Sequence, residues 1–244
     1  MSKKVLVLGH TGMLGHMVCK YLLWKGHDII TTDERWPSER FFQFVNNFDG
    51  DFIVNCVASI PQRTNNFDIN YELPIWLDEN SNCNVIHPGT DGELGDDLYA
   101  ISKTNATKHI ITDGKRTKII KVSLIGPEIY NKVSLMEWFL SNDEECVQGY
   151  DKFYWNGITT LQWSKICNLM INDFESYDVL NIPTSNRVSK YELLEIIKDV
   201  FDKDIEIKKN SKVESERCLK KTDGMPHLDI KTQLKELKDF YYDD

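Results

Sequence analysis

The N-terminal segment combines an apolar run, a glycine-containing turn and a helix-like pattern, and this order restricts the possible folds. Val5 to Leu8 is a continuous apolar run that ends at a glycine, which is typical of a parallel strand covered on both faces. From Met13 onward the apolar residues recur at helical spacing until Gly26, where a helix can end. This order predicts an α/β fold with a doubly wound parallel sheet.

The turn between these segments is Gly9-His10-Thr11-Gly12-Met13-Leu14-Gly15. Its glycines let the backbone bend sharply and approach a pyrophosphate, and the free N–H groups at the start of the helix attract that anion. A second strand over 28–32 leads to Asp33, eighteen residues after the last glycine. An acidic residue near this offset contacts the ribose of adenosine, so the segment predicts a dinucleotide-binding site of the Rossmann type.

The same segment leaves the identity of the dinucleotide open. Asp33 can accept a hydrogen bond from a free ribose 2′-hydroxyl, which favours NAD, whereas Arg35 can bind the additional phosphate of NADP. Both residues also have simpler interpretations. Asp33 could cap the helix that follows, and Arg35 could be a solvated surface charge.

Two further apolar runs predict strands that end near this turn. The run over 52–58 leads into Asn55 to Ser59 at its end, and the run over 84–87 leads into Pro88 to Asp91. Because ligands of open α/β sheets bind at the carboxyl ends of the strands, we expect these segments to share one crevice with the glycine turn.

A tyrosine and a lysine follow at helical spacing. Tyr99 and Lys103 lie four residues apart, so a helix places them on one face. A nearby ammonium lowers the pKa of a phenol and makes it a usable proton donor or acceptor, while the hydroxyl of Thr90 can bind the oxygen on which charge develops. The alternative is an amphipathic helix with a lysine that reaches the solvent.

The second half of the chain predicts a smaller α/β unit. We expect a strand over 117–122 that closes a Rossmann domain over 1–130, and a substrate-binding lobe over 131–244 with segments that return to the core. The expected elements of this half are helices over 135–140, 161–174, 189–201 and 228–241, and strands over 179–182 and near 205–207. The charged run Lys208 to Lys212 is interpreted as a solvated loop.

Composition excludes several classes of protein. The 244-residue chain has a formal net charge of -9, which disfavours binding to nucleic acid or anionic lipid. Its six cysteines lie at least 21 residues apart, without the spacing of a zinc site, so we expect reduced thiols and no metal. The apolar run near the N-terminus stops after four residues, and no segment approaches the length of a membrane span. We therefore expect a cytoplasmic protein that is not bound to a membrane.

These motifs resemble those of the extended short-chain dehydrogenases/reductases, and within them the dTDP-4-dehydrorhamnose reductase family. Gly9, Gly12 and Gly15, then Thr90 and Asp91, then Tyr99 and Lys103 stand in the order of that family. The resemblance extends to 135–141, 155–161 and 188–194, and covers the chain from Lys4 to about Tyr241. It implies NAD(P)H-dependent reduction of the C4 keto group of a nucleotide-linked 4-keto-6-deoxyhexose, for the synthesis of a deoxysugar.

The resemblance also implies a role for each matched residue. Tyr99 donates a proton to the C4 oxygen, Thr90 orients that oxygen, and Lys103 binds the nicotinamide ribose and lowers the pKa of Tyr99. The predicted cofactor site, for NADP(H) or NAD(H), comprises Gly9, Thr11, Gly12, Met13, Leu14, Gly15, Asp33, Arg35, Cys56, Val57, Ala58, Tyr99, Lys103 and Val122. The predicted substrate site comprises Ser59, Asp91, Phe153, Trp155, Asn156 and Arg217.

Parts of the substrate site have alternatives. The aromatic cluster Tyr150, Phe153, Tyr154 and Trp155 could form core, and Arg217 could pair with Glu214 and bind no diphosphate. The chain also departs from the family pattern at two points. Only eight residues separate Thr90 from Tyr99, and Gly89 stands where a serine is common.

Other reactions remain possible on this resemblance. A 4,6-dehydratase usually carries an Asp-Glu pair directly after the threonine, whereas here Asp91 is followed by Gly92. A sugar-nucleotide 4-epimerase is compatible with the same residues. So is a non-catalytic regulatory subunit of the same fold, such as the β subunit of methionine adenosyltransferase. Related enzymes pair through helices, so a homodimer is possible.

Overall fold

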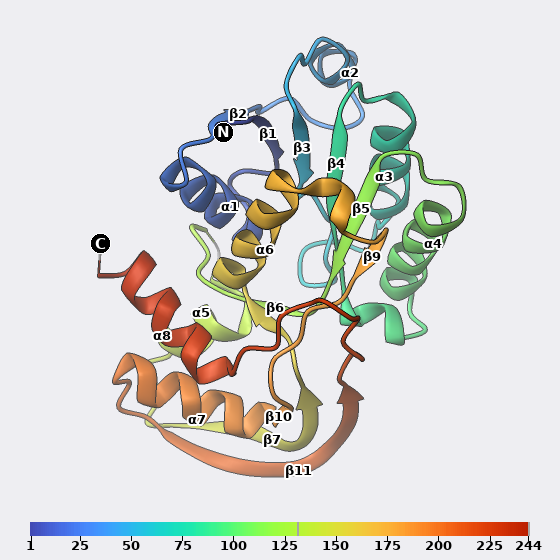
Figure 1. Cartoon of the computed structure of the whole chain (residues 1–244). Coiled ribbons are helices and arrows are strands. Elements are labelled where there is room, and N and C mark those ends of the chain that lie inside the picture. The colour runs from blue at the N-terminus through green and yellow to red at the C-terminus, as the bar shows by residue number, and fades with distance from the viewer. Residues whose placement is uncertain (131, 244) are drawn as a thin grey trace. The chain divides into compact units, whose positions relative to one another are not determined.

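Six parallel strands form the largest sheet of the computed structural model, which describes residues 1–130 and 132–243 (Figure 1). They run in the order β2-β1-β3-β4-β5-β9. Their bounds are Asp28–Thr31, Lys4–Leu8, Phe52–Asn55, Asn84–Gly89, Thr117–Lys121 and Leu180–Asn181. Because β2 and β3 flank β1 on opposite sides, the direction of winding changes at the carboxyl ends of β1 and β3. The predicted Rossmann-type fold class is confirmed.

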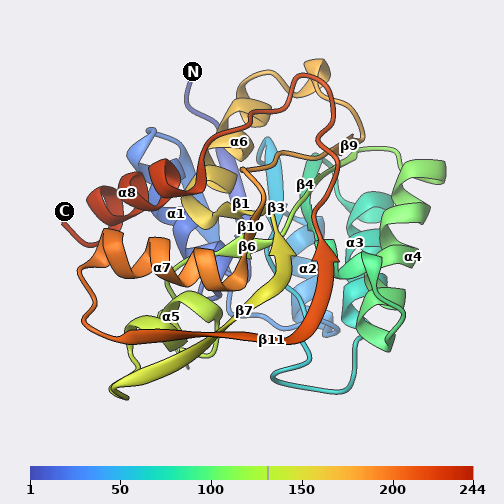
Figure 2. The same ribbon diagram turned by 90° about the horizontal axis from the view of Figure 1, so that it is seen from below.

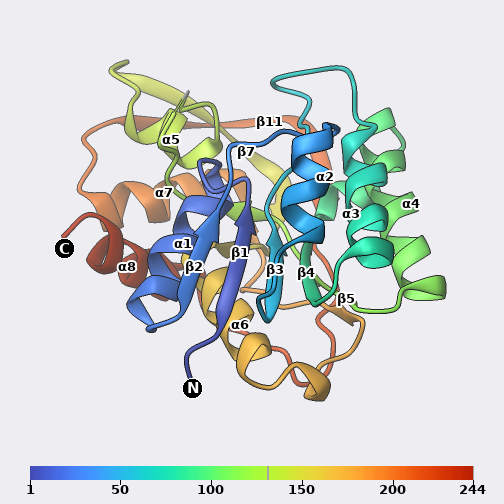
Figure 3. The same ribbon diagram turned by 90° about the horizontal axis from the view of Figure 1, so that it is seen from above.

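Helices cover both faces of this sheet, which is why its strands are apolar on both sides. Figures 1 and 3 show α1 and α6 on one face and α2, α3 and α4 on the other. These helices span Met13–Trp24, Thr160–Asn172, Glu39–Asn46, Ile69–Asn80 and Leu98–Asp113. Short 3₁₀ helices, η1 over Asp91–Leu94 and η2 over Phe174–Ser176, follow β4 and α6.

The core of one face shows how alternate strand residues meet the helices. Leu6 and Leu8 of β1 pack with Ile53 of β3, and α2 and α3 contribute Phe41 and Leu73 to the same cluster. Burying one such side chain stabilises the fold by about 1.5 to 3 kcal/mol. This packing holds the carboxyl ends of β1 and β3 side by side.

The chain forms two compact units. Unit 1 comprises Met1–Lys121 and Trp163–Asn181, and unit 2 comprises Val122–Gln162 and the residues from Ile182 onward. The elements of unit 2 are β6 Leu124–Ile125, α5 Leu135–Leu140, β7 Cys146–Trp155, β8 Ile158–Thr159, β10 Val188–Ser189, α7 Lys190–Phe201, β11 Glu206–Arg217 and α8 Ile230–Tyr241. Strand β7 lies between β10 and β11, and α7 packs against β7 and β11 (Figure 2).

Several elements differ from those expected. The run Lys208–Lys212, interpreted as a loop, lies within β11 and remains mostly exposed. Lys208 to Asn210 pair with β7, and the register breaks between Asn210 and Glu214. The alternation of this edge strand is hidden because most of its side chains are charged. Helix α3 and strand β7 were not predicted, and α2 was expected only as the helix that Asp33 could cap. Helix α3 contains Pro74, a residue that normally indicates a helix end.

Asp78 of α3 fastens the start of β5. Its carboxylate accepts hydrogen bonds from the backbone N–H groups of Lys115, Arg116 and Thr117 at 2.8, 3.0 and 2.9 Å. Burial by itself would raise the pKa of Asp78, but the hydrogen bonds from Thr117, Arg116 and Lys115 outweigh it, so the pKa lies below its ordinary value. The folded state therefore binds this proton more weakly than the unfolded chain does.

We expect Asp78→Asn to lower the free energy of unfolding by about 2 kcal/mol at neutral pH, because charge-assisted hydrogen bonds are lost. The contribution of Asp78 is fully present above the pKa of an unfolded aspartate, about 3.9, and is lost as pH falls toward the folded pKa. Urea unfolding at several pH values measures both effects. The matched control is Asp113→Asn at an exposed site on α4, for which no comparable loss is expected. Equal stability of the Asp78 variant and the wild type at neutral pH would contradict this role.

Candidate active site

Three backbone segments meet at the carboxyl end of β1. Gly9 has a φ of +74°, and its carbonyl oxygen accepts the N–H of Gly12 at 3.0 Å. A methyl group added at Gly15 would lie 2.1 Å from that carbonyl oxygen, and one added at Gly9 would lie 3.0 Å from the backbone of Cys56. Glycine is therefore required at both positions, and the turn is pressed against β1 and the end of β3.

This turn leaves the first N–H groups of α1 available to an anion. Gly12 is the N-cap and has no side chain to occupy them, and the first turn of α1 contains no acidic residue. The close backbone approach and the free helix N-terminus fit a dinucleotide pyrophosphate. Thr11 is exposed and Met13 partly buried, whereas Leu14 and Gly15 are buried.

Asp33 follows β2 and lies near His10 of the glycine turn. Its side chain is 98% exposed, and its carboxylate lies 3.7 Å from Nε2 of His10. Helix α2 is capped by Ser38, whose hydroxyl accepts the N–H of Phe41 at 3.1 Å, so Asp33 is not its cap. Both Asp33 and Arg35 remain accessible from solvent.

The segment after β3 also lies next to the turn. The N–H of Cys56 donates to the carbonyl oxygen of Leu8 at 2.9 Å, and the N–H of Val57 donates to Oδ1 of Asn55 at 3.1 Å. Ser59 is held by the buried side chain of Asn70, which accepts its N–H at 2.8 Å and donates to its carbonyl oxygen at 2.9 Å. Ala58 is exposed. The structure thus places Cys56 and Val57 beside Gly9, whereas Ser59 is held by Asn70 of α3.

Thr90 begins η1 and lies beside Tyr99. Its hydroxyl accepts the N–H of Gly92 at 3.0 Å and lies 3.2 Å from Oδ1 of Asp91. A methyl group at Gly92 would lie 2.8 Å from the Tyr99 ring and 3.3 Å from the Thr90 hydroxyl. The predicted threonine and tyrosine therefore both lie against Gly92.

The environment of Tyr99 keeps its phenol protonated. Burial raises the pKa of Tyr99, and the carboxylates of Asp91, Glu93 and Asp97 raise it further, although the Thr90 hydrogen bond acts in the opposite direction. A protonated phenol is a proton donor. This direction differs from the lowered pKa that the family resemblance implies for Tyr99.

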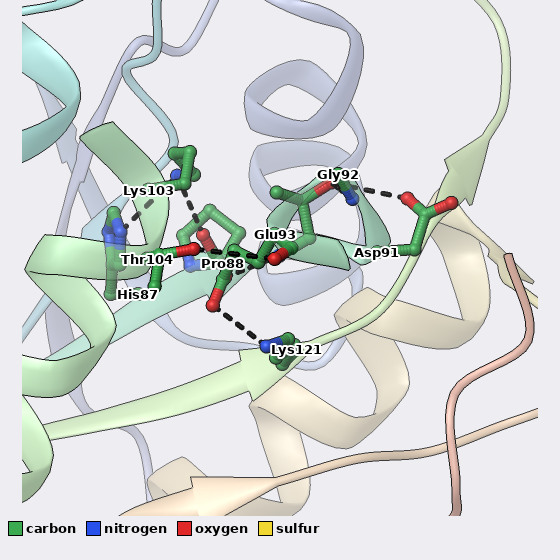
Figure 4. A network of polar contacts seen from close by, with 9 residues as sticks. His87, Pro88, Asp91, Gly92, Glu93, Lys103, Thr104 and Lys121 are labelled. Carbon is green, nitrogen blue, oxygen red and sulfur yellow. Dashed lines mark hydrogen bonds and ion pairs between the residues drawn. The ribbon is translucent and has the colours of Figure 1, made fainter. Parts of the chain in front are cut away.

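Lys103 is 4% exposed, and its amine points toward the end of β4 (Figure 4). Nζ donates to the carbonyl oxygen of Pro88 at 3.0 Å and lies 3.4 Å from Nε2 of His87. Burial lowers the pKa of Lys103 to about 8, and the charge of Glu93 opposes this shift. The ammonium is thus poised to lose its proton slightly above neutral pH.

Glu93 lies among the candidate site residues, although the sequence motifs do not include it. Its side chain is 2% exposed, Oε1 accepts the N–H of Thr90 at 3.2 Å, and Oε2 pairs with Nζ of Lys121 at 2.8 Å (Figure 4). Thr90-Asp91-Gly92-Glu93 forms a capping box, and this sequence signature could have identified it. A methyl group at Gly89 would lie 2.8 Å from Cβ of Lys121, so a serine there would displace the lysine.

The predicted substrate residues of unit 2 differ in exposure. Trp155 is 1% exposed, whereas Phe153 is partly buried. The side chain of Asn156 accepts the N–H of Leu219 at 2.9 Å and donates to its carbonyl oxygen at 2.8 Å. Arg217 is half-buried at the end of β11, and the ion pair of this region joins Arg187 to Glu216 at 2.8 Å. Val122 is buried and follows β5 directly.

Comparison with known proteins supports the assignment of the fold. Residues 5–97 match the model of the NAD dependent epimerase/dehydratase family, a segment that contains the glycine turn and Thr90. The chain resembles a dTDP-4-dehydrorhamnose reductase from Bacillus anthracis, crystallised with NADP, at 14% identity and a TM-score of 0.74 over 100% of both chains. The chain has the fold of an extended short-chain dehydrogenase/reductase. The resemblance identified from the sequence is therefore confirmed at the level of the fold.

Other structures with this extended short-chain dehydrogenase/reductase fold catalyse different reactions. A dTDP-glucose 4,6-dehydratase from Bacillus anthracis, in complex with NAD, has a TM-score of 0.72 at 16% identity over 100% of this chain and 97% of that chain. A UDP-glucose 4-epimerase from Thermotoga maritima, with UDP-glucose, has a TM-score of 0.74 at 14% identity over 98% and 99%. No curated protein matches the chain. The fold by itself does not select among these reactions.

The helices of the described residues give no candidate for a membrane span. None of those in 1–130 or 132–243 is both long and apolar enough to cross a bilayer.

We expect Gly15→Ala to weaken binding of NADPH and NADH at least about tenfold, because the added methyl must displace the Gly9 carbonyl and reshape the turn. Quenching of protein fluorescence by the dinucleotide measures the affinity. Gly50→Ala is the matched control, since its methyl would be equally crowded, 2.1 Å from the Phe48 ring, but before the start of β3. An unchanged dissociation constant for the Gly15 variant would contradict the assignment of this turn.

Proposed function

We propose that the chain is an NAD(P)H-dependent reductase of the C4 keto group of a nucleotide-linked 4-keto-6-deoxyhexose. The observation that carries the proposal is that Thr90 and a protonated Tyr99 both lie against Gly92, and that the buried amine of Lys103 follows one helical turn after Tyr99 on α4. Thr90 is the N-cap of η1 after β4, and the glycine turn lies at the carboxyl ends of β1 and β3 in the same sheet. A bound reduced nicotinamide would supply the hydride for such a reduction.

The residues of the chain have distinct roles in this proposal. The glycine turn and the N-terminus of α1 hold the pyrophosphate, and Asp33 or Arg35 contacts the adenosine ribose. Thr90 hydrogen-bonds the substrate oxygen and orients it toward Tyr99. Tyr99 gives its proton to that oxygen as negative charge develops on it. Its raised pKa suits the reductive direction, because the phenol is protonated at neutral pH.

Lys103, one helical turn after Tyr99 on α4, binds the nicotinamide ribose in this proposal. In unit 2, Asn156, Phe153 and Arg217 are the proposed contacts to the nucleotide sugar, and Trp155 supports them from the interior. Ser59 and Asp91 are proposed contacts in unit 1. The reaction would provide an activated deoxysugar for glycan assembly in the cytoplasm.

A dehydratase is a weaker proposal for a structural reason. Dehydratases usually place an Asp-Glu pair directly after the threonine, whereas here Asp91 is followed by Gly92. The nearest glutamate, Glu93, is buried in its ion pair with Lys121. The same site could serve a 4-epimerase or a non-catalytic subunit. Incubation of the protein with dTDP-, UDP- and GDP-linked 4-keto-6-deoxy sugars and either NADH or NADPH separates these functions. Net oxidation of the dinucleotide supports a reductase, and sugar isomerisation without it supports an epimerase.

We expect Tyr99→Phe to reduce the rate of this oxidation by a factor of about 10² to 10⁴, the usual contribution of one acid–base group. The absorbance of the reduced dinucleotide measures the rate. Tyr71→Phe, at an exposed position of α3, is the matched control and keeps full activity. Turnover by the Tyr99 variant at the wild-type rate would exclude the role of this phenol as proton donor.

We also expect the rate of reduction to fall as pH rises through about 8, because Lys103 then loses the proton that makes it a cation. The rate should be independent of pH just below neutrality. Initial rates measured across this pH range, at saturating dinucleotide, show the pH at which the rate begins to fall. A rate that stays constant well above this pH would show that the charge of Lys103 is not needed.

A further inference from the structure

A buried histidine lies next to the amine of Lys103 and has no role in the function proposed above. His87 of β4 is 1% exposed, and its Nε2 lies 3.4 Å from Nζ of Lys103 (Figure 4). On the other side of the ring, Nδ1 lies 3.2 Å from Nδ2 of Asn55, a residue of β3 that is fully buried. The imidazole therefore links the end of β3 to the amine of α4.

The orientation of the Asn55 amide decides which nitrogen of His87 carries the proton. Oδ1 of Asn55 accepts the backbone N–H of Val57 at 3.1 Å, so a flipped amide would set two donors against each other. Nδ2 consequently faces His87, and an amide nitrogen can only donate. Nδ1 of His87 must then accept, which leaves the proton of the neutral ring on Nε2.

An N–H on Nε2 faces the amine of Lys103. A protonated lysine has three donors and no acceptor, so it cannot accept this N–H, whereas a neutral amine accepts it through its lone pair. The carbonyl oxygen of Pro88, at 3.0 Å, can accept from the amine in either state. We propose that His87 is a positioning residue that stabilises the neutral form of Lys103 by donating its Nε2 proton to the lysine nitrogen.

The charges around Lys103 are consistent with this role. Burial and the charge of Lys103 hold the pKa of His87 well below its ordinary value, so the ring is neutral. The charge of Glu93 of η1 favours the ammonium, but Oε2 of Glu93 is paired with Lys121 of β5, which offsets part of the glutamate charge. Tyr99, on the same helix as Lys103, is held in its protonated and uncharged form. Burial and the His87 N–H thus favour the neutral amine of Lys103, and only the partly neutralised carboxylate of Glu93 favours the ammonium.

The consequence for catalysis rests on the proposed function. When Tyr99 gives its proton to the sugar oxygen, it becomes a tyrosinate that must regain a proton before the next turnover. Lys103 can supply that proton and become a neutral amine, and the amine then regains a proton from solvent. By stabilising the neutral amine, His87 lowers the free energy of the state in which Lys103 has given its proton away.

The first test measures the proton on His87 directly in the full-length wild-type protein. Nitrogen-15 NMR of histidine-labelled protein distinguishes the two neutral tautomers from the imidazolium. We expect the His87 ring to be neutral at neutral pH with its proton on Nε2. A proton on Nδ1, or a charged ring, would overturn the proposal, and neither outcome depends on a variant.

The second test measures the titration of Lys103 by carbon-13 NMR of lysine labelled at Cε, with the signal assigned by Lys103→Met. His87→Gln replaces the ring N–H by a carbonyl oxygen that can accept from the ammonium, so we expect the pKa of Lys103 to rise by about one unit or more. His109→Gln, at the outer side of the same helix, is the matched control and leaves the titration unchanged. An unchanged or lowered pKa in the His87 variant, or an equal rise in the control, would overturn the proposal.

Neither NMR measurement requires turnover, so the proposed function and the role of His87 toward Lys103 are tested independently. If no nucleotide sugar is reduced but the NMR results are as expected, the proposed function is wrong and the role of His87 toward Lys103 stands. If turnover is found, the fall in rate at high pH should move upward in His87→Gln together with the pKa of Lys103. If the pKa of Lys103 rises but the rate still falls at the same pH as in the wild type, Lys103 does not supply the proton, and the catalytic consequence is overturned.

Discussion

The close backbone contact at the carboxyl end of β1 is the constraint on which the rest of unit 1 depends. The carbonyl of Gly9 lies against Gly15 and leaves no room for a side chain there, and a side chain at Gly9 would meet the backbone of Cys56 after β3. This packing places the N-terminus of α1 at the point where the winding of the sheet changes. Ligands of open α/β sheets bind at this edge, where Thr90 follows β4.

Polar contacts hold the short connection between β4 and α4. The capping box of η1 holds Thr90 through Glu93, and Glu93 is in turn neutralised by Lys121 from the next strand. A buried carboxylate without such a partner would be strongly destabilising. Lys121 also lies against Gly89, where an added methyl group would be 2.8 Å from its Cβ, so a larger residue does not fit there without displacing the lysine. Both contacts hold the short connection in place.

Prediction from sequence succeeded where a local pattern was decisive. The four apolar runs of β1, β3, β4 and β5 could be identified because strands covered on both faces are continuously apolar. It failed where tertiary context overrode the local signal. Pro74 lies inside α3, and the charged residues of β11 form a strand because β7 provides a partner for their backbone. The glycine turn, Thr90, Tyr99 and Lys103 stay predicted site residues, and Glu93 and His87, which contact Thr90 and Lys103, were not among the predictions.

The amino-acid sequence by itself determined the class of fold and the order of the chemical groups, because glycine spacing, apolar periodicity and the Tyr-x-x-x-Lys interval are local properties. Only the tertiary structure decided the protonation of those groups. The pKa values of Tyr99 and Lys103 depend on burial and on Asp91, Glu93, Asp97 and His87, and the hydrogen-bonding state of His87 depends on Asn55 from another strand. Such electrostatic effects arise from distances between segments that are far apart along the chain, and no local pattern encodes them.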